Sequence, residues 1–296
     1  MINSLRRRFV IFSVIVISSI IIVVAFFIYL GSPGDSPIHR YIPSVSIGIV
    51  MVFIGSWLLS KIAIRPIKTA WQRQLDFTAD ASHELRTPIT VIQTNLELVM
   101  DSPGETVESQ MRWLENIGAE NMRMAKLVDD LLTLSRADTD QQALEVETFM
   151  FDDILFEAIQ PFEPLAHEKN IDVEINANEK VSIVGDRKRI KQLVLILVDN
   201  AIKYTDSGSI TVSLSRSEKE IVLTVSDTGC GIGAEHQDKI FDRFYRVTET
   251  RNLNQDGSGL GLSIAKWIVQ EHGGTIAVSS ALGVGTVFTA SFPDKR

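Results

Sequence analysis

Two long uncharged runs lie near the start of the chain. Residues 9–30 and residues 41–60 carry no charged side chain, and at about 1.5 Å per residue each run can cross a bilayer as a helix. The basic residues that flank the outer sides of this pair are Arg6, Arg7, Arg8, Lys61, Arg65 and Lys68. Because basic residues favour the cytoplasmic side, we predict a two-helix transmembrane hairpin over residues 1–66, with both termini in the cytoplasm.

A cleaved signal peptide is the alternative interpretation of the first run. That run is too long for a signal peptide, and no A-x-A-like cleavage site closes it. The link over residues 31–40 is too short to fold into a sensing domain. We therefore expect a stimulus to be sensed within the lipid bilayer or through a membrane partner.

The next segment, over residues 67–140, has the pattern of a helical hairpin. Apolar or small residues recur in steps of three and four at Leu75, Thr78, Ala81, Leu85, Ile89, Ile92, Leu96 and Val99. The sequence DSPG at 101–104 signals a turn, and a second helical stretch follows with Ile117, Met124, Val128 and Leu131 on one face. The apolar stripe is large, so we predict a homodimer in which two hairpins form a four-helix bundle.

The remainder of the chain mixes strand-like and helical patterns. Short β-like runs occur at 171–175, 181–184, 209–214, 221–225, 275–278 and 286–292, with helical runs at 187–204 and 261–272. This mixture predicts an α/β sandwich domain over residues 146–296.

Charge and cysteine content exclude several classes of function. The net charge of -8 argues against general nucleic-acid binding, which needs a basic face. Cys230 is the single cysteine, so neither an internal disulfide nor a metal-thiolate cluster can form within one chain.

The first candidate for chemistry is His83, within the segment SHELRTP at 82–88. His83 is two positions from Leu85, about 200° around the helix from the apolar seam, so its imidazole is expected to face solvent and act as a nucleophile. Pro88 cannot donate to the carbonyl of Glu84, which loosens the helix beside the histidine. The alternative is an ordinary surface histidine near a helix kink.

A second candidate is the segment DNAIKY at 199–204. Asn200, Lys203 and Tyr204 share one helix face, and an amide oxygen, an ammonium group and an aromatic ring together suit a metal, a phosphate and a base. The alternative is a polar patch on an amphipathic helix.

Two glycine-rich segments complete the candidate site. DTGCGIG at 227–233 follows a predicted strand; Asp227 offers an acceptor, and Gly229, Gly231 and Gly233 allow the backbone to approach a flat ligand. GSGLGL at 257–262 opens a predicted helix, where backbone N–H groups form a phosphate site. It is neither a P-loop, since no Gly-Lys-Ser/Thr follows, nor a dinucleotide fingerprint, since its third glycine falls one residue early.

These segments resemble the motifs of bacterial two-component sensor histidine kinases. FTADASHELRTPI at 77–89 resembles the H-box, DNAIKY the N-box, and the two glycine-rich segments the Gly-boxes, while FDRFYR at 241–246 is similar to the F-box. The order and spacing agree from about residue 69 to residue 292. The resemblance implies a plasma-membrane kinase that uses ATP and Mg²⁺, a GHKL-type (Bergerat) ATP-binding domain, and a response regulator as partner.

The resemblance also implies roles for single residues around the phosphoryl acceptor. His83 would accept the phosphoryl group and pass it to an aspartate of the response regulator. Glu84 would polarise the imidazole, and Thr87 would serve the reverse, phosphatase reaction.

For the nucleotide, the resemblance implies a second set of roles. Asn200 would bind Mg²⁺, Lys203 a phosphate, and Tyr204 would lie against the nucleotide. Asp227 would accept a hydrogen bond from the adenine amino group. The remaining implied contacts are Arg243 or Arg246 near the triphosphate, a mobile lid over residues 247–256, and the second Gly-box, with Gly257, Ser258, Gly259, Leu260 and Gly261.

One departure from the family pattern leaves alternatives open. Ile196 stands where many members carry a second asparagine, and one Asn ligand is enough only if water and phosphate oxygens complete the Mg²⁺ shell. The alternative is therefore a scaffold with weak kinase activity that acts mainly as a phosphatase of its response regulator. A GHKL ATPase without phosphotransfer is the third interpretation, but it has no reason to carry the His83 segment.

Overall fold

The fold comes from a computed structural model, which describes residues 15–23, 25–26, 37–137, 144–177, 180–247 and 257–294. The chain divides into two compact units, Met1–Ala79 and Asp80–Arg296. Within the described ranges, no helix combines the length and the apolar character that a membrane crossing requires. The first predicted span and the link after it lie partly outside the described residues.

A helical hairpin forms the first part of the second unit. From Asp80 onward, helix α2 (Pro37–Met100) belongs to this unit, and the predicted turn joins it to helix α3 (Val107–Ala137). The side chain of Gln110 closes this turn by donating to the carbonyl oxygens of Val99, at 3.3 Å, and Ser102, at 2.8 Å. This confirms the helical hairpin that the three-and-four spacing predicts.

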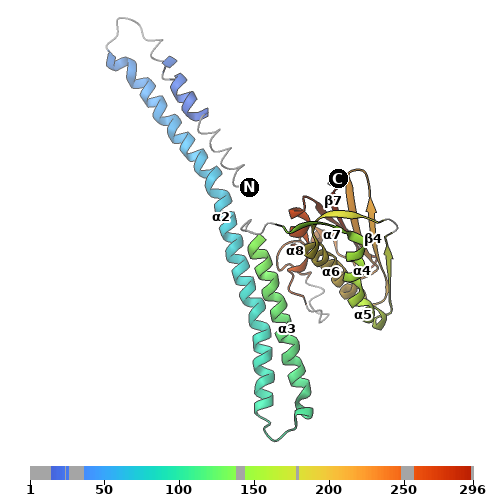
Figure 1. The fold of residues 1–296 in the computed structure, drawn as a ribbon. Helices are drawn as coiled ribbons and strands as arrows, with labels where there is room; N and C mark the ends of the chain where they lie inside the picture. Colours follow the sequence, from blue (N-terminus) through green and yellow to red (C-terminus); the bar gives the residue numbers. More distant parts are fainter. Residues whose placement is uncertain are drawn as a thin grey trace. The chain divides into compact units, whose positions relative to one another are not determined.

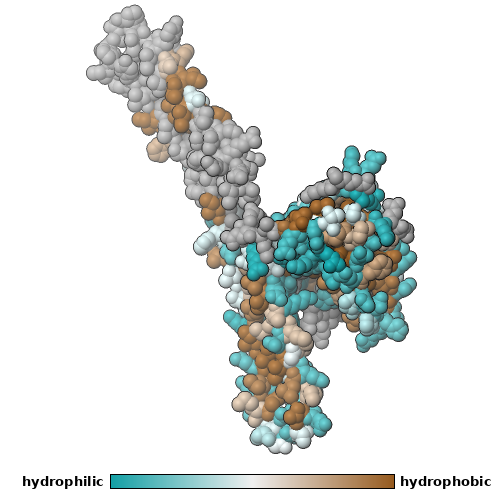
Figure 2. Space-filling model, in the orientation of Figure 1, coloured by the Kyte–Doolittle hydropathy of each residue, from teal (hydrophilic) through white to brown (hydrophobic). Residues whose placement is uncertain are grey.

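The apolar seam predicted along the first helix of the hairpin is divided between two faces. Ala81, Pro88 and Asn95, seven residues apart, are buried, whereas Ile89 and Leu96 on the same helix are 42% and 47% exposed. On α3 the exposed apolar positions include Leu114, Val128 and Leu132, and Figure 2 shows apolar side chains gathered along this hairpin. A single hairpin therefore leaves a second apolar face in water, which is costly unless another surface covers it.

The rest of the second unit is an α/β domain (Figure 1). Its strands are β1 (Val146–Met150), β2 (Ile171–Asn176), β3 (Ser182–Asp186), β4 (Gly208–Arg216), β5 (Glu220–Asp227), β6 (Thr275–Ala281) and β7 (Gly285–Pro293). Its helices are α4 (Phe151–Ile159), the 3-10 turn η1 (Gln160–Phe162), α5 (Glu163–Glu168), α6 (Arg187–Tyr204), α7 (Ala234–Gln237) and α8 (Gly261–Glu271). The main sheet has the order β2-β4-β5-β7-β6, and β1 pairs with β3 in a separate ribbon.

The main sheet is mixed and buries one face. Strand β2 runs parallel to β4, and the other neighbours are antiparallel. Along β4 the buried side chains alternate at Ile210, Val212 and Leu214, as a half-buried strand requires. This face packs against α6, which lies between α4 and α8. The helix-on-sheet layering confirms the α/β class that the sequence predicts.

The start of α6 is fixed by buried polar contacts. The Asp186 carboxylate accepts from the backbone N–H of Arg189 at 3.1 Å, which caps the helix. The backbone N–H of Asp186 donates to Nε2 of the buried His272 at 3.0 Å, and Nδ1 of the same ring lies 2.7 Å from the carbonyl oxygen of Ile268. Because that carbonyl can only accept, Nδ1 is the donor of the ring and Nε2 is its acceptor. The histidine thus joins the end of α8 to the start of α6.

Candidate functional site

One cavity of about 800 Å³ joins most of the residues singled out in the sequence. Its wall comes from α6, from the loops at 227–233 and 257–261, and from the helical hairpin. The predicted site residues that line it are Glu84, Asn200, Lys203, Tyr204, Asp227, Gly231, Gly233, Arg246, Gly257, Ser258, Gly259 and Gly261. Segments that are far apart in the sequence therefore share one hollow.

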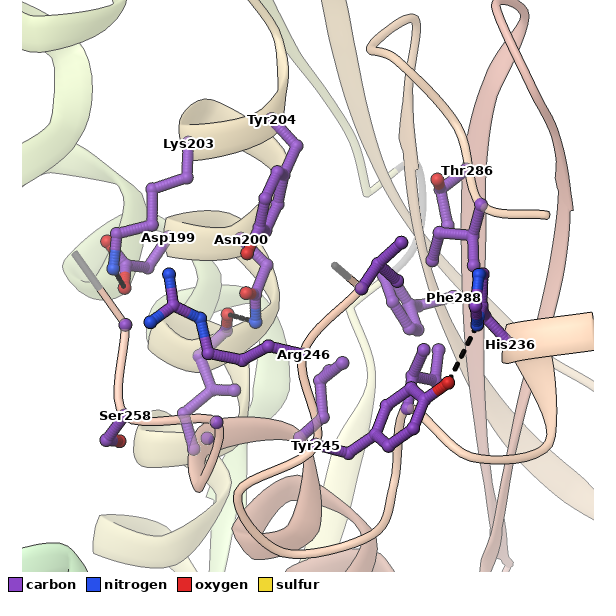
Figure 3. Close-up of a pocket in the computed structure, with 18 of the residues that line it drawn as sticks. Asp199, Asn200, Lys203, Tyr204, His236, Tyr245, Arg246, Ser258, Thr286 and Phe288 are labelled. Atoms are coloured by element: carbon purple, nitrogen blue, oxygen red, sulfur yellow. Dashed lines mark hydrogen bonds and ion pairs between the residues drawn. The ribbon is translucent and has the colours of Figure 1, made fainter. Parts of the chain in front are cut away.

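The last two turns of α6 present the polar wall of this cavity (Figure 3). The amide nitrogen of Asn200 donates to the carbonyl oxygen of Ile196 at 2.8 Å, so in this orientation Oδ1 is the atom that can face a cation. Lys203 Nζ lies 3.1 Å from Oδ2 of Asp199. Burial raises the pKa of Tyr204, with the nearby Arg246 acting against that rise, so the phenol is neutral at physiological pH.

Asp227 ends β5 and also lines the cavity. Its Oδ1 accepts from the backbone N–H of Gly229 at 2.9 Å and from that of Thr286 at 3.2 Å. Burial raises the pKa of this carboxyl above its ordinary value, and the two backbone hydrogen bonds lower it again in part. A buried carboxylate held through one oxygen is suited to accept a hydrogen bond from a ligand.

The glycines of the first loop have a structural reason that the sequence did not reveal. Gly231 has a φ of +71°, and a Cβ there would collide with the carbonyl of Ala281. A Cβ on Gly229 would collide with the carbonyl of Tyr204, and Gly229 is absent from the described cavity lining. Close packing of the loop against its own protein therefore requires these two glycines, whether or not a ligand is bound.

The second glycine-rich loop is fixed to the F-box-like segment. Phe244 has a positive φ of 60°, and its N–H donates to the carbonyl oxygen of Gly259 at 3.0 Å. A Cβ on Gly259, whose φ is +70°, would lie 2.7 Å from the backbone carbon of Phe244. Arg246 lines the cavity, whereas Arg243 and the fully buried Leu260 are not among its lining residues. The predicted lid over residues 247–256 lies outside the described residues beyond Val247.

The histidine segment lies at the hairpin wall. His83 is exposed, as its angular distance from Leu85 predicts. Its neighbours Glu84 and Pro88 line the cavity, and Thr87 Oγ1 lies 3.5 Å from the carbonyl oxygen of His83. His83 itself is not among the residues that line the cavity, but the segment that carries it borders the cavity.

Tertiary structure adds lining residues that sequence reasoning missed. From α3 these are Arg123, Met124, Lys126, Leu127 and Asp130; around α7 and β7 they include Glu235, His236, Tyr245, Thr286 and Phe288. His236 Nδ1 and the Tyr245 hydroxyl are 2.7 Å apart (Figure 3). Tyr245 belongs to the F-box-like segment at 241–246, although no contact with a ligand was predicted for it. No motif signals His236, because a single polar residue on a helix ordinarily faces solvent.

We expect Asp130→Asn to stabilise the protein at neutral pH. Burial raises the pKa of Asp130 from 3.8 to about 6; attraction to Lys126 opposes that rise and repulsion from Asp129 adds to it. As pH rises from about 4 to 6 the unfolded chain loses this proton first, so the carboxyl's contribution to stability falls across that window and stays low above it. With solvent screening of the partly exposed side chain, we expect a gain of about 1 kcal/mol at pH 7.5.

Thermal unfolding from pH 4 to pH 8 measures this effect. The difference between Asp130→Asn and wild type should grow through the window and level off above about pH 6. The exposed neighbour Asp129 provides the matched control, Asp129→Asn, which should show a smaller difference. A constant difference at every pH would contradict the burial of Asp130.

Family models match two parts of the chain. Residues 73–140 match the His Kinase A (phospho-acceptor) domain, and residues 185–296 match the histidine kinase-, DNA gyrase B-, and HSP90-like ATPase. The sensor histidine kinase RppB of Synechocystis sp. is 34% identical over 84% of this chain and 56% of its own length. The chain spans about half the length of the curated relatives it matches.

Solved structures of similar proteins agree with these matches. Histidine kinase ThkA in complex with the response regulator protein TrrA has a TM-score of 0.62 and 28% identity, covering 77% of this chain and 65% of that one. Full-length ShkA in complex with AMPPNP has a TM-score of 0.56 and 25% identity, covering 73% of this chain and 45% of that one.

Proposed function

Since this chain belongs to the bacterial two-component sensor histidine kinases, we propose that it uses ATP to phosphorylate its own His83 and passes the phosphoryl group to an aspartate of a response regulator. The observation that carries the proposal is the shared cavity. It is lined both by the polar end of α6 and by Glu84 and Pro88, which follow His83 on α2. Donor and acceptor of a phosphoryl group would meet at one hollow.

The lining residues fit ATP in size and in chemistry. A volume of about 800 Å³ lies within the usual range for ligand pockets. Asp227, with one oxygen held by Gly229 and Thr286, offers an acceptor to the adenine amino group, and Tyr204 and Phe288 offer aromatic surface. Asp227 would thus select adenine over a base that carries an acceptor there.

The other end of the cavity fits a triphosphate. Lys203 and Arg246 supply positive charge there. The backbone around Gly261 begins α8, an eleven-residue helix whose N-terminal N–H groups favour an anion. Oδ1 of Asn200 would coordinate Mg²⁺, which when bound neutralises phosphate charge.

His83 and Glu84 would carry the transfer itself. A ring nitrogen of His83 forms a bond to the γ-phosphorus as the bond from that phosphorus to the oxygen of ADP breaks. Glu84, partly buried at the cavity wall, would hydrogen-bond to the N–H of the ring and stabilise its growing positive charge. Thr87, one helical turn after His83, would act in dephosphorylation of the response regulator.

Incubation with γ-labelled ATP and Mg²⁺ tests this function. The full chain in detergent should acquire an acid-labile, base-stable label, and a response regulator should then remove it. Full binding of ATP without any label would reject the kinase proposal.

Cys230 provides a chemical test of where the nucleotide binds. This thiol lines the cavity, and partial burial together with the nearby Asp227 charge raises its pKa. Because the thiolate is the reactive form, iodoacetamide at pH 8 should modify Cys230 more slowly in the folded protein than in the unfolded chain. Mg²⁺ and ATP should slow the reaction at least ~10-fold more. Labelling read by mass spectrometry is unambiguous because the chain has one cysteine; equal rates with and without ATP would contradict the placement.

The alternative of a scaffold that is mainly a phosphatase is not favoured. That interpretation rested on Ile196, whose backbone carbonyl accepts from Asn200 at 2.8 Å. A Cβ on Gly261 would lie 3.4 Å from Cγ2 of Ile196. The side chain therefore packs α6 against the start of α8, which supports a structural reason for an apolar residue there.

We also propose that the protein is a homodimer in a bacterial plasma membrane. The exposed apolar face of the hairpin supports the dimer, and the uncharged runs at 9–30 and 41–60 with their basic flanks support the membrane hairpin. Sedimentation of the detergent-solubilised chain should give a dimer, and cell fractionation should place it with membranes.

A cellular response that survives replacement of both runs by an unrelated hairpin would reject sensing within the bilayer or through a membrane partner.

A further inference from the structure

Three charged side chains meet where α3 reaches the cavity. Asp199 Oδ2 on α6 lies 3.1 Å from Lys203 Nζ, one turn along the same helix, and 3.8 Å from Lys126 Nζ on α3. All three residues line the cavity. One carboxylate oxygen is therefore approached by two ammonium groups that belong to different parts of the molecule.

The two ion pairs differ in strength. The pair of Lys203 with Asp199 has hydrogen-bond length, and both side chains are only about 30% exposed. Lys126 is 71% exposed and stands beyond hydrogen-bond distance. Water screens such an exposed pair, so Lys203 is the main partner of Asp199 in this structure.

A triphosphate changes this balance, because it competes for Lys203. An ammonium group that turns toward phosphate oxygens weakens its hydrogen bond to Asp199, and the carboxylate then attracts the remaining cation more strongly. Lys126 is the cation on α3 that the structure already places 3.8 Å from Oδ2 of Asp199. The charges thus favour a change of partner from Lys203 to Lys126.

The surroundings of Lys126 connect such a change of partner with the segment that carries His83. The adjacent Leu127 is buried in the same apolar cluster as core residues of the α/β domain. Glu84 and Pro88, on the helix paired with α3, line the same cavity. A tighter attachment of Lys126 would therefore hold the His83 segment at the cavity.

We propose that Lys126 is a positioning residue for phosphoryl transfer, with Asp199 exchanging Lys203 for Lys126 when a triphosphate enters, so that nucleotide binding strengthens the attachment of α3 to the α/β domain. The inference rests on the proposed function of the cavity. Lys126 touches neither the imidazole nor the transferred group in this role. It acts through Asp199.

The test compares Lys126→Glu and Lys126→Arg with wild type, using the full chain in detergent. Lys188→Glu is the matched control, because Lys188 is an exposed lysine paired with Glu145 outside the cavity. Three quantities are measured: the dissociation constant of AMPPNP with Mg²⁺, the single-turnover rate of labelling at saturating ATP, and AMPPNP-induced hydrogen-exchange protection of the α3 amides around residue 126.

The expected pattern separates positioning from simple phosphate binding. Lys126→Glu should lower the labelling rate ~10-fold and raise the dissociation constant by a smaller factor, because nucleotide binding and the attachment of α3 are coupled, and it should abolish the added protection of α3. Lys126→Arg should keep at least about half of the rate, because it keeps the charge, and Lys188→Glu should match wild type. A wild-type rate in Lys126→Glu, or a loss confined to the dissociation constant, would overturn the inference.

Failure of the proposed function gives a different result. If wild type acquires no label, the kinase proposal fails, and hydrogen exchange with AMPPNP still decides the exchange of partners. Protection of α3 that appears in wild type and vanishes in Lys126→Glu supports it. Equal protection in both proteins, or none in wild type, overturns it.

Discussion

His83→Gln should abolish labelling of the protein by γ-labelled ATP, with a loss of at least ~100-fold. The glutamine side chain is of similar length to histidine and is also polar. The lone pair of its amide nitrogen is delocalised, however, so that nitrogen cannot attack phosphorus. Because His83 is exposed on α2 and makes no packing contribution to the core, the variant should unfold at the wild-type temperature and bind AMPPNP with the wild-type affinity.

The control for this prediction is His167→Gln. His167 is also an exposed histidine on a helix, but it lies in α5 away from the cavity lining. It should label at the wild-type rate. If the label persisted in His83→Gln and disappeared in His167→Gln, the assignment of His83 as the phosphoryl acceptor would be wrong.

Asn200→Ala should lower the labelling rate about 100-fold at saturating Mg²⁺. The substitution removes the amide oxygen that would coordinate the ion and also the hydrogen bond from the Asn200 side chain to Ile196. Alanine is a strong helix former, so α6 should persist. The loss should be larger in the rate than in the affinity for free ATP, because the metal acts mainly on the transferred phosphate.

A second alanine variant on the same helix separates metal binding from helix stability. Lys191 pairs with Glu157 at 3.2 Å and is not among the cavity residues. Lys191→Ala should retain the rate and its Mg²⁺ dependence. Comparison of the rate across a Mg²⁺ titration is the measurement; an Asn200→Ala protein with an unchanged Mg²⁺ midpoint and rate would exclude the residue from the metal site.

Local sequence patterns predicted most of the elements around the site. Helix α6 covers the predicted residues 187–204, because apolar residues such as Ile190, Leu197 and Val198 recur with a helical period and all three are buried. Strand β4 follows the two-residue alternation of Ile210, Val212 and Leu214. In both cases the period of the side chains specifies the element without reference to distant residues.

Short elements without a clear period were missed. Strand β1 has five residues, of which the first three are exposed, so it shows little alternation. Its pairing with β3 depends on residues more distant in the sequence, such as Val184 opposite Thr148. Helices α4 and α5 were not predicted either. Both are short, and the proline-containing turn η1 separates them.

The helical seam was predicted as one surface, and tertiary packing divides it. Ala81 is buried and Leu85 is partly buried, whereas Ile89 and Leu96 remain exposed. The predicted positions cover about 120° of the helix circumference, which is wide enough to contact two neighbours. The sequence pattern alone does not assign each apolar residue to one of them.

The sequence by itself determined the helical hairpin, the α/β class and the segments that carry chemistry, because side-chain periodicity and motif spacing are local properties. Tertiary structure alone decided that Gly231 and Gly259 are required by close contacts with Ala281 and Phe244. It also decided that Lys126 approaches Asp199. Such relations depend on which distant backbones pack together, and the desolvation and charge that follow from packing are absent from any single segment of the chain.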